Sequence, residues 1–175
     1  MKNVLRALIA VALLAGTFAP PAMADGILVK FKGGIGVNPV SNVAGTGTQN
    51  TDGTFTFTDV KRNDVRGVLP GGQPWVIESL KVDVMVDGRI RVDGRGLLLA
   101  GGNGIGTAGG QQVKALLFCG PGLGVAHSSG LVTLEPDGDF RIDDVLTPAP
   151  PHSCENPVLL IVNVGDRWFA AGIPQ

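Results

Sequence analysis

The stretch SLKVDVMVDGRIRV, residues 79–92, decides the fold class. Its valines at 82, 84 and 86 fall on one face of an extended chain, because successive side chains of a strand point to opposite faces. Asp87-Gly88 follows and favours a tight hairpin turn, since both residues tolerate a positive φ. Arg89–Val92 then resumes the alternation of charged and apolar residues. The stretch therefore predicts an antiparallel β-hairpin with one buried face.

Further strand signals continue along the chain, separated by turn residues among its 27 glycines and 12 prolines. Trp75–Val86 is expected to bend near Ser79, and Asp93-Gly94 with Gly96 to form a bulge or a second turn. Val158–Val164 is almost continuously apolar, which is typical of a central strand, and Arg167–Ile173 is expected to pair with it. The remaining predicted strands are Ile27–Phe31, Thr54–Val60, Leu97–Ala100 and Val113–Phe118, with a hairpin formed by Leu131–Leu134 and Asp139–Val145.

These signals predict an all-β chain, either an antiparallel β-sandwich or a closed barrel of about eight to ten short strands. One internal similarity adds to this picture. Residues 52–60 and 137–145 both read D-G-x-F-x-[F/I]-x-D-V. A duplication that produced two related β units explains the match, and so does the convergence of hairpins on Asp-Gly turns followed by alternating apolar residues.

The N-terminal residues have the features of a secretory signal peptide. Lys2 and Arg6 lie beside an apolar run from Ala7 to Phe18, and Ala22-Met23-Ala24 offers the small residues that a signal peptidase requires. We therefore expect residues 1–24 to be removed and residues 25–175 to form a single exported domain, periplasmic or secreted. No segment after residue 24 is long and apolar enough to predict a membrane span.

Charge and cysteine content restrict the possible partners. Without Lys2 and Arg6 the chain carries 12 basic against 15 acidic residues, and it has no basic run. This composition argues against a nucleic-acid partner, which requires a positive surface. Cys119 and Cys154 are the two cysteines of the chain, and in an exported protein they are expected to form one structural disulfide.

Candidate contact residues lie in a glycine-rich loop from Gly101 to Gly110. Its sequence contains G-x-G-x-x-G, but the helix and βαβ context of a dinucleotide site are not predicted. Glycine backbone is open to a polar ligand or a partner. We name as possible contact residues Gly101, Gly102, Asn103, Gly104, Gly106, Gly109 and, from a second loop, His127.

Candidate metal ligands and catalytic groups are fewer. Clustered carboxylates suit a hard cation, which makes Asp137, Asp139, Asp143 and Asp144 candidates for a calcium site, although their spacing departs from an EF-hand. His127 and His152 have serine neighbours, but no nucleophile signature accompanies them, and both are expected to be exposed in loops. Trp168 is expected in the core, and Trp75 is left open between core and ligand stacking.

The sequence thus favours a non-catalytic binding or structural module without a cofactor, whose partner is an unidentified protein or small molecule. The alternative is a lipocalin-like or cyclase-like barrel that binds or converts a small apolar ligand. That alternative requires a deep apolar cavity inside the barrel.

Overall fold

A computed structural model describes residues 26–43, 47–56 and 60–175. The predicted signal peptide and residues 57–59 of the predicted strand Thr54–Val60 lie outside the described residues. The described chain is all-β and antiparallel, which confirms the predicted class at that level. It contains no helix that is long and apolar enough to cross a membrane.

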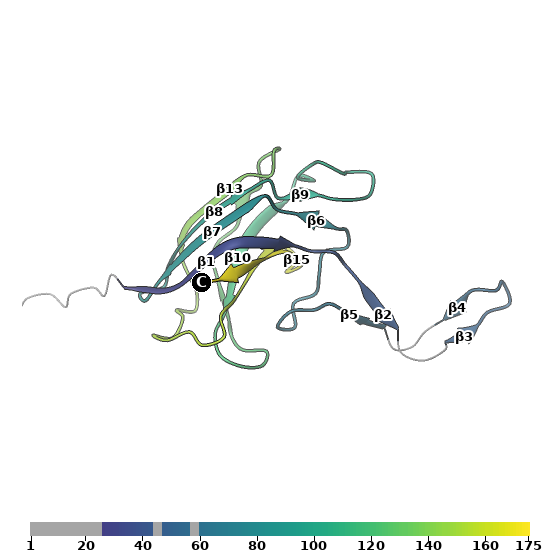
Figure 1. The fold of residues 1–175 in the computed structure, drawn as a ribbon, viewed down its shortest axis with the longest axis horizontal. Helices are drawn as coiled ribbons and strands as arrows, with labels where there is room; N and C mark the ends of the chain where they lie inside the picture. Colours follow the sequence, from purple (N-terminus) through teal and green to yellow (C-terminus); the bar gives the residue numbers. More distant parts are fainter. Residues whose placement is uncertain (1–25, 44–46, 57–59) are drawn as a thin grey trace, which may run out of the picture.

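One nine-stranded sheet forms the main body and curls into a half-barrel (Figure 1). Neighbouring strands are hydrogen-bonded in the order β11-β10-β14-β15-β1-β7-β8-β13, and β12 also pairs with β10. In that order the strands are β11 (Ala126–Ser128), β10 (Gln112–Phe118), β14 (Val158–Asn163), β15 (Trp168–Pro174), β1 (Ile27–Gly36), β7 (Ser79–Met85), β8 (Arg89–Arg95) and β13 (Phe140–Val145), with β12 at Val132–Thr133.

Three two-stranded sheets accompany the main body. They pair β2 (Ser41–Val43) with β5 (Val60–Arg62), β3 (Thr48–Gln49) with β4 (Phe55–Thr56), and β6 (Trp75–Val76) with β9 (Leu98–Leu99). In Figure 1 the first two extend away from the curled sheet, whereas β6 and β9 lie beside it. The predicted bend near Ser79 is the break between β6 and β7.

The hairpin that the sequence predicts at residues 79–92 is β7, the turn at Asp87-Gly88 and β8. Its inward side chains are at most 2% exposed, and Leu80, Val84 and Ile90 have no exposed surface, whereas the intervening charged side chains face solvent. The same alternation continues into β13.

Four consecutive residues of β14, from Leu159 to Val162, are fully buried. Because successive side chains of a strand point to opposite faces, both faces of β14 must be covered. The prediction of a central strand is confirmed, as is its pairing with β15.

Gly94 does not form the bulge or turn that the sequence predicts at Asp93-Gly94. It lies within β8, directly opposite Phe140 of β13, and a Cβ built on Gly94 would be 2.2 Å from two carbons of the Phe140 ring. The missing side chain therefore makes room for an aromatic ring that covers this part of the strand. The turn comes at Gly96, where φ is 62°.

The predicted hairpin between residues 131–134 and 139–145 is also wrong in its pairing. The turn itself forms, with the Gly138 N–H donating to the Glu135 carbonyl. The two strands then separate, because β12 pairs with β10 and β13 pairs with β8. Ser128, the last residue of β11, and Thr147, which follows β13, form an isolated antiparallel bridge. This bridge joins the two edge strands of the main sheet at one point. A cleft remains between β12 and β13.

The internal similarity reflects a shared turn. In both segments the glycine has a positive φ, 85° at Gly53 and 84° at Gly138, and its N–H donates to the carbonyl three residues earlier. The side chains of Asp52 and Asp137 each accept a hydrogen bond from the amide two residues later. Beyond the turns the segments differ, since β4 belongs to a two-stranded sheet and β13 to an end of the main sheet. They do not occupy equivalent strand positions, so the structure argues against a duplication.

Candidate functional site

The disulfide forms between Cys119 and Cys154, as predicted, with their Cα atoms 4.8 Å apart. It links the end of β10 to the segment that leads into β14, and the Gly120 N–H donates to the Glu155 carbonyl beside it. Both cysteines are half-buried against the core. The pair therefore closes the long loop that carries β11, β12 and β13, which is a structural role.

His127 is not in an exposed loop. It lies in β11, is 6% exposed, and its Nδ1–H donates to the Pro148 carbonyl at 2.8 Å. The expectation of exposure is wrong because this segment pairs with β10 and becomes part of the sheet. The neighbouring hydroxyls of Ser128 and Ser129 donate to backbone carbonyls. His152 is exposed, as expected.

The four candidate aspartates are engaged separately. Asp137 accepts a hydrogen bond within its turn, and Asp139 accepts one from the Gly96 N–H. Asp143 lies 3.8 Å from Arg91, and Asp144 accepts hydrogen bonds from two backbone amides. Among the described residues there is no group of three or more potential metal ligands. The structure thus does not bring these carboxylates together.

The glycine-rich loop is closed by its own hydrogen bonds. The Gly106 N–H donates to the Leu99 carbonyl and the Leu99 N–H to the Thr107 carbonyl, while the Thr107 hydroxyl donates to the Gly104 carbonyl. Gly106 itself has a φ of 80°, which explains why glycine is needed there. A strand, β10, follows the loop, so the helix that a dinucleotide fingerprint needs does not follow the glycines.

One end of this loop borders a cleft that is lined in part by an aromatic pair. The rings of Trp75 and Phe169 are stacked with centroids 4.0 Å apart and an angle of 13° between their planes. The cleft has a volume of about 350 Å³ and is lined by Gly71, Gly72, Gln73, Trp75, Leu99, Gly109, Gln111, Asn163, Arg167 and Phe169. We call it the Trp75 cleft.

Backbone hydrogen bonds hold this aromatic pair in place. The Trp75 N–H donates to the Val37 carbonyl, and the Val37 N–H donates to the Phe169 carbonyl. Gly71 allows the close approach of the chain, since a Cβ there would be 3.0 Å from the Phe169 ring. The pair is therefore fixed by three segments that are distant in sequence.

The Trp75 indole is a largely buried ring with an unused donor. Trp75 is 5% exposed, and within the described residues its Nε1–H has no hydrogen-bond partner. No fully enclosed side-chain nitrogen or oxygen of the described residues lacks a partner, so this Nε1 keeps some contact with solvent, and Trp75 lines the cleft. The indole N–H of a buried tryptophan usually finds a protein partner. This one is instead available to water or a ligand.

The other tryptophan, Trp168, shows the usual arrangement. It is 6% exposed and its Nε1–H donates to the Asn63 carbonyl. Its predicted core position is confirmed.

Arg167 provides the charge of the Trp75 cleft. It is half-buried, and within the part of the chain that the structure describes its guanidinium has no ion pair and no hydrogen bond. The cleft lining contains no Asp or Glu. Gln111 and Asn163 are committed to each other, because the Asn163 Nδ2–H donates to Gln111 Oε1. The donors left for a ligand are those of Trp75 and Arg167, with the exposed Gln73 amide at the rim.

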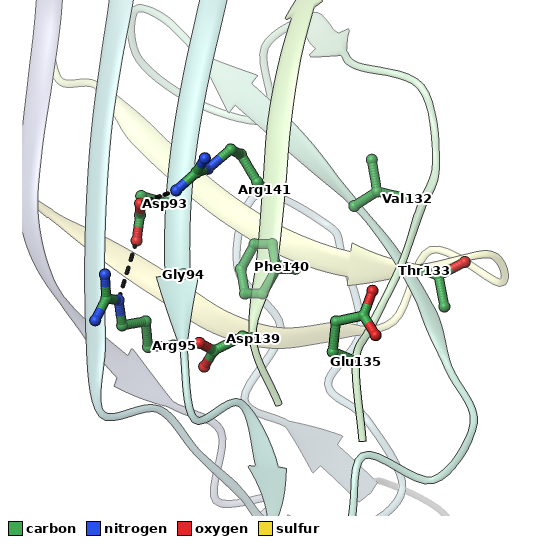
Figure 2. Close-up of a pocket in the computed structure, with 9 residues that line it drawn as sticks. All are labelled: Asp93, Gly94, Arg95, Val132, Thr133, Glu135, Asp139, Phe140 and Arg141. Atoms are coloured by element: carbon green, nitrogen blue, oxygen red, sulfur yellow. Dashed lines mark hydrogen bonds and ion pairs between the residues drawn. The ribbon is translucent and has the colours of Figure 1, made fainter. Parts of the chain in front are cut away.

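A second cleft of about 430 Å³ lies where β12 and β13 separate (Figure 2). Its two arginines already have a partner, since Asp93 accepts hydrogen bonds from Arg141 and from Arg95. The hydrogen bond from Arg141, followed by that from Arg95, holds the pKa of Asp93 below its ordinary value. Its charged groups thus largely satisfy one another, whereas the donors of the Trp75 cleft do not.

Sequence reasoning identifies part of this site. Gly109 of the predicted contact loop lines the Trp75 cleft, while Gly101 and Gly102 lie against the side chains of Pro74 and Gln73. It misses Arg167 and Phe169, which the sequence marks only as parts of a strand. The run GGQP at residues 71–74 is the available signal, because glycines beside an aromatic residue allow a close approach.

Comparison of the chain with protein-family models, with curated proteins and with solved structures gives no match.

Proposed function

We propose that this chain is a non-catalytic binding module and that the Trp75 cleft holds its ligand. The observation that carries the proposal is the Trp75 indole, which is 5% exposed, lines a cleft and has an N–H without a partner among the described residues. Folding removes most of this ring from water but does not fully enclose its one polar group. A ligand acceptor there would complete its hydrogen bonding.

The surroundings of the cleft also support binding. A rigid sheet with an ordered loop at its edge is a common platform for recognition, since the contact groups are positioned before the ligand arrives. The lipocalin-like alternative requires an apolar cavity behind the sheet. The core side chains of the described strands are instead packed against one another, and Leu80, Leu117 and Ile161 have no exposed surface.

The proposed place of action is outside the cytoplasm. The Cys119–Cys154 disulfide indicates an oxidising compartment, either extracellular or periplasmic. The apolar N-terminal segment from Ala7 to Phe18 supports export through a signal peptide.

A cleft-filling variant tests this function. Gly72 lines the cleft, its φ is not positive, and a Cβ added to it would have no atom within 4 Å, so Gly72→Phe adds a ring without straining the backbone. The matched control is Gly26→Leu, at a site where a Cβ would make ordinary contacts with Val86. Thermal unfolding is measured with a panel of small organic acids, amino acids and sugars.

We expect some members of the panel to raise the melting temperature of the wild-type protein and of Gly26→Leu, but not that of Gly72→Phe. A ligand at a hundred times its Kd stabilises the folded state by about 2.7 kcal/mol. Stabilisation that persists in Gly72→Phe would place binding elsewhere and contradict the proposal, and so would the absence of stabilisation by every compound.

A further inference from the structure

The free side-chain groups inside the Trp75 cleft, those of Trp75 and Arg167, are donors and include one positive charge, while the exposed Gln73 amide adds a donor and an acceptor at the rim. The Arg167 guanidinium presents several N–H groups in a planar fork, and Trp75 Nε1 adds a further N–H. The side-chain oxygens nearby are engaged, because Gln111 Oε1 accepts from Asn163 and Asn163 Oδ1 accepts from the Gly165 and Arg167 amides. A ligand that supplies acceptors and negative charge matches the Trp75 and Arg167 groups of this arrangement.

The remaining lining is apolar or has no side chain. Leu99, the ring of Phe169 and three glycines complete the cleft. This lining offers little to a second charged group, and it favours an apolar or weakly polar body on the ligand. Its volume of about 350 Å³ is suited to a small molecule.

From this distribution we infer that the Trp75 cleft binds a small organic carboxylate, with its oxygens on the Arg167 fork and the Trp75 indole N–H. Arginine and carboxylate form paired, charge-assisted hydrogen bonds that match in geometry. The inference rests on the proposed function and specifies its ligand class. A carboxylate would neutralise the charge of the unpaired Arg167 guanidinium, and one of its oxygens would accept a hydrogen bond from the Trp75 indole N–H.

The two tryptophans make a direct test feasible. The chain has two indole N–H groups, and that of Trp168 is occupied by the Asn63 carbonyl. In a ¹H–¹⁵N spectrum of the purified disulfide-bonded protein, the indole region therefore contains a reporter for the cleft and an internal reference. Trp75→Phe assigns the two peaks by removing one of them.

The probes are benzoate and glucuronate, which place a carboxylate on an aromatic and on a sugar body. Benzamide and glucose are their neutral counterparts, and inorganic phosphate tests a different anion. We expect benzoate or glucuronate to move the Trp75 peak in a saturable manner and to leave the Trp168 peak in place. The acid that binds more tightly identifies the source of the carboxylate.

Arg167→Gln removes the charge, and Arg91→Gln is its control, because Arg91 is exposed on the outer face of β8. Because Arg167→Gln removes a charge-assisted hydrogen bond, we expect it to raise the Kd of the acids by about tenfold or more, whereas Arg91→Gln should leave the Kd unchanged. Arg167→Lys keeps the charge but not the fork, and we expect intermediate binding.

The outcomes separate the two proposals. If benzamide and glucose move the Trp75 peak as strongly as the acids, or if Arg167→Gln binds the acids normally, the carboxylate inference is wrong and the cleft remains a binding site. Binding of phosphate alone also overturns it. If none of the five probes moves the Trp75 peak, the carboxylate inference is wrong, and the panel measured on Gly72→Phe then decides the proposed function independently.

Discussion

Gly94→Ala is expected to destabilise the protein, although replacing a glycine inside a strand by alanine ordinarily stabilises it. Gly94 has no positive φ, so alanine can adopt its backbone conformation, and relief of glycine's excess freedom in the unfolded chain is worth about 0.5–1 kcal/mol. The opposing effect comes from Phe140. The new Cβ would be 2.2 Å from two ring carbons, whereas non-bonded carbons settle at about 3.5–4.0 Å.

The ring must therefore move by more than about 1 Å, and Phe140 is only 5% exposed, so its surroundings are closely packed. Insertion of a methyl group into a packed site costs about 1–3 kcal/mol. After the backbone gain is subtracted, we expect Gly94→Ala to lower the free energy of unfolding by up to about 2.5 kcal/mol, and by about 1.3 kcal/mol at the middle of the two ranges. Urea unfolding followed by circular dichroism measures this change.

A double-mutant cycle identifies the cause. In a Phe140→Leu background no ring covers Gly94, so the same alanine substitution should be neutral or stabilising, which gives a coupling of at least about 1 kcal/mol. Gly72→Ala is the control, because no atom lies within 4 Å of its Cβ position and alanine should stabilise there by about 0.4–1 kcal/mol. The steric explanation would be refuted if Gly94→Ala stabilised the protein, or if it lowered the free energy of unfolding equally in the wild-type and Phe140→Leu backgrounds.

Three other perturbations test the disulfide, an ion pair and a buried histidine. Replacement of both Cys119 and Cys154 by Ser releases a loop of 35 residues and should lower the free energy of unfolding by about 3.8 kcal/mol at 25 °C, measured by urea unfolding; a loss below about 1 kcal/mol would contradict a stabilising role of the disulfide. Asp93 has a lowered pKa in the folded state, so its contribution is present above its unfolded pKa of about 3.9 and is lost as the pH falls through the lower folded value. Because Asp93 is partly exposed, the difference in the free energy of unfolding between wild type and Asp93→Asn should stay below about 1 kcal/mol at pH 6 and vanish towards pH 2. A difference that grew on acidification would mean that folding raises the pKa of Asp93, which contradicts the prediction. His127→Ala removes a ring that is 6% exposed together with its hydrogen bond to the Pro148 carbonyl, and should cost about 1–3 kcal/mol. His152→Ala, at an exposed site, should change the free energy of unfolding by less than about 0.5 kcal/mol, and equal effects at the two sites would contradict this assignment.

Local chemistry determined much of the secondary structure. The alternation in β7 and β8 and the Asp-Gly turns depend on residues within a few positions of one another, so the sequence predicts them directly. The disulfide is predictable because two cysteines leave a single intramolecular pairing. The long apolar run of β14 indicates burial on both faces, which the structure confirms.

Pairing between distant strands is harder to predict. The sequence predicts one hairpin over residues 131–145 because a turn lies between two alternating segments, yet β12 and β13 each find another partner. Period-2 alternation shows which side chains face inward, but every antiparallel neighbour satisfies that pattern equally. The sequence predicts a bulge or a turn at Gly94 for a similar reason, because only the cross-strand neighbour Phe140 explains the missing side chain.

The sequence by itself thus determined the all-β class of the described chain, its main turns and its disulfide, and it singled out the loop whose Gly109 lines the Trp75 cleft. The tertiary structure alone decided the strand order and the Trp75 cleft. That cleft combines residues 71–75, the end of the glycine-rich loop and the turn between β14 and β15. Whether a tryptophan N–H or a guanidinium finds a partner depends on which distant backbone packs beside it, and no local pattern carries that information.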